Sequence, residues 1–436
     1  MTITEKHVRP SGVPGLVDPR PPTAPEYFHV LAKPTGPICN LDCEYCFFLS
    51  KEALYPGDRF RMTDEVLDLY VRQLLEAHAS APEVTVAWQG GEPTLMGIDF
   101  FRRSLELTER YRRPGQQVHH TMQTNGTLLT DEWCELLAEH GFLVGISIDG
   151  PPELHDRYRV DKRGNPSSEK VLRGLALLQQ HGVDVNVLCT VNAANQDHGL
   201  EVYRYFRDDL GTRFIQFIPI VERDNDTGFQ EGDRVTDRSV APDAWGRFLV
   251  SVFDEWLRRD VGTVFVSQFD AALASWLGVP PALCVFAETC GNAVALEHNG
   301  DVYSCDHFVE PDYLLGNIGK THLVELLASP EQRAFGEAKR DTLPRYCLEC
   351  EVRFACNGEC PKNRFTLTPD GDPGLNYLCS GYKLFFGHIG GPMKLMADLL
   401  RQGRFADEVM AVFAQAARNE PCPCGSGRKA KLCHAR

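Results

Sequence analysis

Long apolar runs are absent from this sequence of 436 residues. No run approaches the ~18 to 20 residues that a transmembrane helix requires. The polar, proline-rich segment up to Pro25 also lacks the apolar stretch of a secretory signal. We therefore expect a cytoplasmic protein with no membrane partner.

Basic charge is scarce as well, because 45 Lys and Arg residues stand against 60 Asp and Glu residues, for a formal net charge of −15. This balance disfavours nucleic acid as a general partner. Repeats of the solenoid type are missing too. A hydrophobic content of 43% over this length predicts a globular protein with a sizeable core and more than one domain.

Strand and helix patterns alternate from Tyr27 to about Asp260. Short β-branched runs are separated by amphipathic stretches, the pattern of parallel strands with helical crossovers. The six predicted strands are Phe28–Ala32, Val84–Trp88, Val118–Met122, Leu143–Ile148, Val185–Val191 and Phe214–Ile218. Six units are too few for an eight-fold barrel, so we predict an α/β fold with a partial, TIM-like (β/α)6 barrel and its chemistry at the carboxyl ends of the strands.

The regular alternation fades between Cys284 and Cys379, where cysteines become dense. There we predict a compact segment held by metal rather than by a large apolar core. The stretch Leu384–Arg418 predicts mainly helix, broken around Gly387–Pro392. The predicted division is an N-terminal extension (1–26), the barrel (27–260), a cysteine-rich domain (261–386), a helical segment (387–419) and a basic tail (420–436).

Sixteen cysteines are the most informative feature of the sequence. Cytoplasmic reductants keep thiols reduced, so metal ligation explains this number better than disulfides do. The cysteines fall into a set of three, a set of eight, a terminal set of three and two singles. The singles, Cys134 and Cys189, have no ligand-spaced neighbour, so we predict that they are small buried apolar residues.

Cys39, Cys43 and Cys46 form the first set, on a loop directly after the first predicted strand. Three cysteines can hold a four-iron cluster and leave one iron free for an outside ligand. A structural zinc site would need four closed ligands. The alternative is a zinc knuckle that takes its fourth ligand from elsewhere in the chain.

The spacing of this set, with Tyr45 before its third cysteine, resembles the radical S-adenosylmethionine (SAM) superfamily. The resemblance extends to Gln89–Pro93, Ser147–Gly150 and Arg159, and it implies that SAM chelates the open iron while bare glycine backbone approaches the cofactor. Taken alone, the glycine pair would be a turn and Arg159 a surface charge. Gln123–Gly126 is either part of the active-site floor or a plain turn. The implied cofactor-binding residues are Tyr45, Gly90, Gly91, Glu92, Ser147, Asp149, Arg159 and Val221.

The set of eight resembles the SPASM extension of peptide-modifying radical SAM enzymes. Eight thiolates suffice for two auxiliary four-iron clusters with four cysteine ligands each. The resemblance assigns Cys284, Cys290, Cys305 and Cys360 to the first auxiliary cluster, and Cys347, Cys350, Cys356 and Cys379 to the second. Fully ligated clusters are suited to carrying electrons. The alternative is that clusters or zinc serve here only as structural staples.

Three further segments, Phe28–Gly36, Cys46–Lys51 and Gln216–Pro219, resemble the anaerobic sulfatase-maturating enzymes. The resemblance implies that a radical derived from SAM initiates oxidation of a cysteine or serine in a sulfatase precursor to Cα-formylglycine. It makes Asp306 the general base that takes the thiol or hydroxyl proton. It also implies three [4Fe-4S] clusters and an electron donor such as flavodoxin or ferredoxin.

The tail from Pro421 onward resembles the SEC-C zinc motif. Its four nitrogen and sulfur ligands suit a closed tetrahedral zinc site, and a disordered basic tail is the alternative. The motif is additional to the maturase pattern, so we expect nothing catalytic to depend on it. The implied zinc ligands are Cys422, Cys424, Cys433 and His434.

Two other functions compete with sulfatase maturation. A SPASM enzyme that crosslinks or epimerises a ribosomally made peptide would use the same clusters on another substrate. A non-catalytic metal-binding adaptor would need no cofactor pocket. The segments around the first cysteine set disfavour the former, and the coincidence of an open-iron motif with a cofactor pocket disfavours the latter.

Overall fold

A single sheet of ten strands organises the computed structural model, which describes residues 21–434; residues 1–20 of the predicted N-terminal extension and the last two of the tail lie outside the described residues. The strand order is β10-β9-β8-β1-β2-β3-β4-β5-β6-β7. All neighbours from β8 to β7 are parallel, and β9 and β10 are added antiparallel beyond β8. The strands are β1 His29–Lys33, β2 Glu83–Trp88, β3 Gln117–Thr124, β4 Leu143–Ser147, β5 Asp184–Val191, β6 Phe214–Pro219, β7 Phe265–Val266, β8 Ala293–Glu297, β9 Asp301–Tyr303 and β10 Leu314–Asn317.

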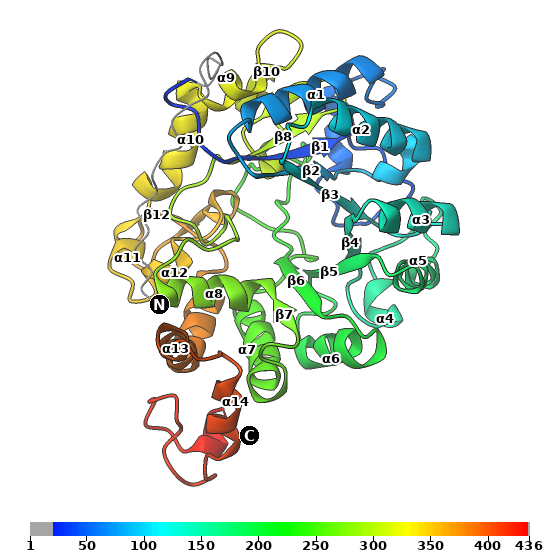
Figure 1. Ribbon diagram of the computed structural model, residues 1–436. Coiled ribbons are helices and arrows are strands. Elements are labelled where there is room, and N and C mark those ends of the chain that lie inside the picture. The colour runs from blue at the N-terminus through cyan, green and yellow to red at the C-terminus, as the bar shows by residue number, and fades with distance from the viewer. Residues whose placement is uncertain (1–20, 435–436) are drawn as a thin grey trace.

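Helices cover the outer face of this curved sheet, with α1 to α6 between consecutive parallel strands (Figure 1). Threonine caps begin two of them: Thr63 accepts a hydrogen bond from the backbone N–H of Val66 in α1, and Thr130 accepts one from the backbone N–H of Trp133 in α3. The helices are α1 Asp64–Ala77, α2 Ile98–Tyr111, α3 Asp131–Glu139, α4 Pro152–His155, α5 Ser168–Gln180, α6 Gly199–Arg204, α7 Pro242–Arg259, α8 Ser267–Leu277, α9 Leu323–Leu327, α10 Pro330–Asp341, α11 Arg345–Leu348, α12 Arg353–Cys356, α13 Cys379–Arg401 and α14 Glu408–Ala414. A two-stranded sheet pairs β11 Thr366–Leu367 with β12 Pro373–Leu375.

The apolar core runs from the barrel into the cysteine-rich region. Val30 on β1 and Val294 and Leu296 on β8 are fully buried in one cluster. The first half of the cysteine-rich region therefore shares the core of the barrel, which the sequence did not indicate. Short helices and the small β11–β12 sheet follow, and there the alternation of strand and helix fades as predicted.

The predicted fold class is confirmed, because the six predicted strands are β1 to β6 of a parallel sheet and the cysteine-rich region follows them. The predicted helix break around Gly387–Pro392 is wrong. Helix α13 runs without interruption from Cys379 to Arg401 and contains Pro392. It packs closely against α7, where the backbones meet at Gly246 and Gly381, and this tertiary packing outweighs the local helix breakers.

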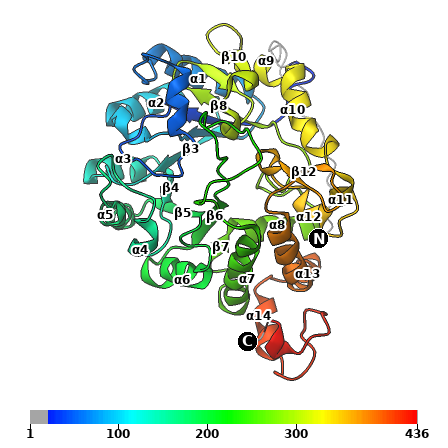
Figure 2. The ribbon, with the colours of Figure 1, turned by 180° about the vertical axis from the view of Figure 1, so that it is seen from behind.

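Helix α13 also leads to the C-terminal tail. Figure 2, seen from behind, shows the tail beside α13 and α14, at the end of the molecule away from β10. No helix among residues 21–434 is long and apolar enough to cross a membrane.

Candidate active site and metal centres

A buried polar network joins the cysteine loop after β1 to the ends of β4 and β5. The Tyr45 hydroxyl donates a hydrogen bond to Oδ2 of Asp149, and Nε of Arg159 lies 2.9 Å from the same oxygen. On β5, the backbone N–H of Thr190 donates to Asp149 Oδ1 at 2.9 Å. Burial would raise the pKa of the Asp149 carboxyl, but the Arg159 guanidinium and further hydrogen bonds hold this pKa below its usual value.

The structure thus brings Tyr45, Asp149 and Arg159 together and makes the carboxylate of Asp149 the link between them. Arg159 is 8% exposed, so it is not the surface charge that its isolated position in the sequence would suggest. The direct contact of these three side chains with SAM stays a prediction.

Glu92, in the glycine-rich segment after β2, is fully buried and turned toward the protein. Its carboxylate accepts hydrogen bonds from the Thr94 hydroxyl at 2.6 Å, the Thr124 hydroxyl at 2.7 Å and the backbone N–H of Asn125 at 2.8 Å. Burial raises the pKa of Glu92 in spite of these bonds. Glu92 therefore fixes the shape of the glycine-rich turn from β3, a supporting role that is compatible with cofactor binding by the backbone.

The end of β3 lies against the first cysteine set. The side-chain amide of Asn125 lies 3.6 Å from Cys39 Sγ and donates to Asn40 Oδ1 at 2.9 Å. Asn40 in turn donates to the hydroxyl of Thr127 at 2.8 Å. These contacts show that the segment positions the cysteine loop, so it is more than a strand-ending turn.

Two other predicted cofactor residues lie at the same edge of the sheet. Ser147 ends β4, and its hydroxyl accepts a hydrogen bond from the side chain of Gln123 at 3.0 Å. Val221 lies just beyond β6 and is 4% exposed. Their positions suit a pocket at the carboxyl ends of the strands, and their contact with SAM stays a prediction.

A buried ion pair joins Lys33, the last residue of β1, to Asp306. The Lys33 ammonium also lies 3.9 Å from the centre of the Phe48 ring, and the side-chain amide of Gln89 lies 3.5 Å from Asp306 Oδ2. Burial would raise the pKa of Asp306, but the charge of Lys33 lowers it below its usual value. Asp306 is therefore held as a carboxylate.

Sequence reasoning singled out Asp306 but missed Lys33. The available signal was a lysine at a core-facing position of an apolar strand, where an unpaired charge would be costly. Lys33 also explains part of the glycine pattern: a Cβ at Gly90 would lie 2.7 Å from the Lys33 side chain. The Gly90 position therefore has a structural demand besides any approach to cofactor.

Two groups of thiols occupy the cysteine-rich region. In the first, the pKa of Cys360 is raised to about 12, chiefly by burial, and Cys284 is among the neighbours that raise it. Burial raises the pKa of Cys305 as well, and Cys360 and Cys284 add to the rise. The second group lines one cavity, beside Tyr382 and Lys383; its members are Cys347, Cys350, Cys356 and Cys379.

Buried thiols that raise one another's pKa would repel one another as thiolates unless a metal neutralised their charge. In the second group the pKa of Cys356 is raised to about 12 by burial, and Cys379 and Cys347 contribute to the rise. Four-iron clusters with cysteine ligands fit both groups chemically. The assignment of individual ligands stays a prediction.

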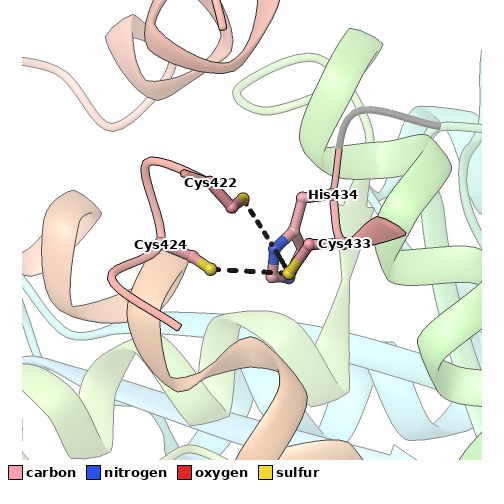
Figure 3. A group of neighbouring side chains, drawn as sticks. All are labelled: Cys422, Cys424, Cys433 and His434. Carbon is pink, nitrogen blue, oxygen red and sulfur yellow. Dashed lines mark hydrogen bonds between the residues drawn. The ribbon is translucent and has the colours of Figure 1, made fainter. Parts of the chain in front are cut away.

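The C-terminal residues converge in the manner of a closed metal site (Figure 3). Nδ1 of His434 lies 3.1 Å from Cys433 Sγ and 3.5 Å from Cys422 Sγ, and the sulfurs of Cys424 and Cys433 are 3.6 Å apart. Burial lowers the pKa of His434 to about 4, which keeps the imidazole neutral as a metal ligand requires. Three sulfurs and one nitrogen fit a structural zinc ion.

The single cysteines behave as predicted. Cys134 on α3 and Cys189 on β5 are both 0% exposed and belong to the apolar core. Neither lies in the two thiol groups or in the terminal site.

Three family models match the chain: the Radical SAM superfamily over residues 34–204, an iron–sulfur cluster-binding domain over residues 284–351, and the SEC-C motif over residues 418–436. Together with the cysteine loop at the barrel edge, they define a radical SAM enzyme with a SPASM domain. Such an enzyme binds SAM and iron–sulfur clusters.

The serine-type anaerobic sulfatase-maturating enzyme of Bacteroides thetaiotaomicron is 46% identical over 387 residues, which cover 86% of this chain and 92% of that protein. The cysteine-type anaerobic sulfatase-maturating enzyme of Clostridium perfringens (strain 13 / Type A) is 33% identical over 363 residues, covering 82% and 95%. The solved structure of native anSMEcpe with bound AdoMet and Cp18Cys peptide is 31% identical, with a TM-score of 0.76, and covers 85% of this chain and 99% of that one.

This chain belongs to the family of anaerobic sulfatase-maturating enzymes. The predicted activity, a radical SAM oxidation, is therefore confirmed at the level of the family. Neither the ribosomal-peptide enzyme nor the metal-binding adaptor is supported.

Replacement of Arg159 by alanine tests the buried network. Arg159→Ala leaves the Asp149 carboxylate buried without its charge partner, so we expect a loss of about 3–5 kcal/mol of stability. The matched control is Arg102→Ala, since Arg102 pairs with Asp99 and Glu132 at the surface, where such pairs contribute about 0–1 kcal/mol. Anaerobic thermal unfolding of the reconstituted proteins compares the two. Equal midpoints would contradict the role assigned to the network.

Proposed function

We propose that this chain oxidises a serine of a sulfatase precursor to Cα-formylglycine, the serine-type variant of the family's activity. The serine-type relative is 46% identical, whereas the cysteine-type relative is 33% identical. The serine-type enzyme of Klebsiella aerogenes is 36% identical over 89% of this chain. Cysteine is the alternative target.

The Lys33–Asp306 ion pair is the observation that carries the proposed mechanism. It joins the end of β1, from which the first cysteine loop departs, to the residue next to Cys305. Lys33 lies close to the cysteine loop as well, because its ammonium lies 3.9 Å from the centre of the ring of Phe48, two residues after Cys46. One carboxylate therefore lies between the site proposed for the SAM cluster and a proposed auxiliary ligand.

Asp306 is the proposed general base. Its carboxylate takes the hydroxyl proton of the target serine, and general bases contribute typically ~10² to 10⁴-fold to a rate. Lys33 keeps that carboxylate ionised, so Asp306 is able to accept a proton at the cost of some basicity. SAM and the iron–sulfur cluster, when bound, would supply the radical chemistry that removes a hydrogen atom from the β-carbon, and a proposed auxiliary cluster would accept the one electron that remains after the base takes the proton.

The burial of the site suits a serine target. Lys33 is 1% exposed and Asp306 is 8% exposed, so bulk water has little access to the base. Oxidation of serine gives the aldehyde directly, whereas a thioaldehyde from cysteine must still be hydrolysed. Exclusion of water from the site therefore does not hinder the oxidation of serine.

The proposed cofactors are three [4Fe-4S] clusters and one zinc ion. Cys39, Cys43 and Cys46 would hold the cluster that binds SAM, the two thiol groups of the cysteine-rich domain would hold the auxiliary clusters, and the C-terminal motif would hold zinc. The precursor polypeptide is the proposed partner, and a flavodoxin or ferredoxin is the proposed electron donor. The proposed domain division is the one predicted from the sequence, except that the boundary at 386/387 falls inside the uninterrupted helix α13.

Paired precursor peptides that differ only in serine or cysteine at the target position test the substrate. We expect a higher kcat/KM for the serine peptide. Mass spectrometry follows its oxidation as the loss of two hydrogens, and that of the cysteine peptide as the loss of two hydrogens with exchange of sulfur for oxygen. An alanine peptide is the control. A clear preference for the cysteine peptide would reverse the proposed specificity, and modification of neither would refute the proposed activity.

Replacement of the base separates the start of the reaction from its completion. Asp306→Asn keeps the size of the side chain but removes its use as a base, so we expect SAM cleavage to persist while formylglycine falls by ~10² or more. Cys39→Ala should abolish both products together. Deoxyadenosine and modified peptide are measured in the same anaerobic reaction. Asp312→Asn, at an exposed position nearby, is the matched control, and a wild-type yield from Asp306→Asn would remove this residue from the mechanism.

Iron analysis tests the number of clusters. Anaerobic reconstitution should give about twelve irons per chain, because three plus eight thiolates supply three four-iron clusters. Cys379→Ala should reduce the content by about four irons. Cys134→Ala, which alters a buried cysteine of the core, should leave it unchanged. Full activity in a preparation with a single cluster would contradict an electron-carrying role for the others.

A further inference from the structure

Helix α13 carries Gly390, Gly391 and Pro392 in its interior, and the C-terminal motif rests at this point. Proline has no backbone N–H, so the carbonyl of His388, four residues earlier, lacks the donor that a helix normally supplies. An interior proline costs a helix about 3 kcal/mol relative to alanine. The carbonyl of His388 is thus left free to accept a hydrogen bond from another group.

One ring nitrogen of His434 lacks a hydrogen-bond partner among the described residues. It is 1% exposed, and its Nδ1 faces the sulfurs of Cys422 and Cys433. Its Nε2 is buried and has no hydrogen-bond partner within residues 21–434. A buried N–H without an acceptor costs free energy, so an acceptor close to this nitrogen is required.

His388 of α13 lies beside this imidazole. The rings of His388 and His434 lie with their centres 4.3 Å apart. The His388 ring is itself held by Asp254 of α7, whose Oδ1 lies 2.7 Å from Nε2 of His388.

The neighbouring glycine shows how tightly the motif fits. A Cβ at Gly391 would lie 2.0 Å from the carbonyl oxygen of Cys424, closer than any side chain can approach. A Cβ at Gly387, one helical turn earlier, would meet nothing within 4 Å. Gly391 is therefore needed for the contact between α13 and the motif, and Gly387 is not.

We propose that the interior of α13 is the outer shell of the C-terminal zinc site, in which the His388 carbonyl released by Pro392 accepts the Nε2–H of His434. Histidine ligands of zinc commonly donate their second ring N–H to a carbonyl or carboxylate, which fixes the tautomer and the ring orientation. Here the bond fixes the proton on Nε2 and leaves Nδ1 for the metal. Gly391 completes the contact by admitting the backbone of Cys424. The motif is a docked part of the enzyme body, joined to the helix that begins with Cys379.

Replacement of the proline gives the sharpest test. Pro392→Ala restores an N–H that competes for the His388 carbonyl, and alanine favours the helix, so the variant should fold. We expect its zinc affinity to fall by about 10 to 100-fold, the usual cost of losing an outer-shell partner. Affinity is measured on full-length, cluster-reconstituted protein equilibrated with zinc-buffered chelator, with bound zinc and iron determined by mass spectrometry. A proline that served only to shape the helix would leave zinc affinity unchanged, and that result would overturn the assignment of the carbonyl.

A glycine pair on the same helix tests the docking contact. Gly391→Ala and Gly387→Ala both add one methyl group and both raise helix propensity by about 1 kcal/mol. Gly391→Ala alone should displace Cys424 and weaken zinc binding, while Gly387→Ala should bind zinc as the wild type does. Iron content should be unchanged in Gly387→Ala, which confirms that the protein is folded. Equal zinc affinity in the two variants would overturn the proposed docking.

Discussion

Parallel pairing between β1 and β8 brings two regions that are far apart in the sequence to one edge of one sheet. The register runs from His29 opposite Ala293 to Lys33 opposite Glu297. Successive side chains of a strand point to opposite faces, so a slip of one residue would turn Lys33 away from Asp306. The ion pair, the approach of the first cysteine loop to the proposed auxiliary ligands, and the continuity of the apolar core all depend on this register.

Features with a local signal could be predicted from the sequence. The six barrel strands follow from β-branched runs. The three cysteine sets follow from ligand spacing, which within a loop does not depend on the tertiary structure. Asp306 could be predicted because it directly follows Cys305 in a segment that resembles the family. The grouping of Cys347, Cys350, Cys356 and Cys379 around one cavity agrees with the spacing, although the ligand assignment rests on the family resemblance.

Features that depend on distant partners could not be predicted. Strands β8 to β10 are three to five residues long, and they join the barrel sheet through β8, which pairs with β1 more than 250 residues away. A buried lysine at position 33 can be explained only by its ion pair with Asp306, which is distant in the sequence. In α13, local propensity at Gly390–Pro392 favoured a break, but burial against α7 and contact with the C-terminal motif outweigh it.

Helix α13 connects residues that are proposed to serve two different metals. Cys379 is its first residue, and Gly391 lies twelve residues further, about 18 Å along the axis. A helix held at both ends resists bending more than a helix held at one end. With both metals bound as proposed, loss of zinc would free α13 from the C-terminal motif and loosen Cys379 at its first turn, so the supply of zinc in the cell would influence how firmly the enzyme retains the proposed cluster.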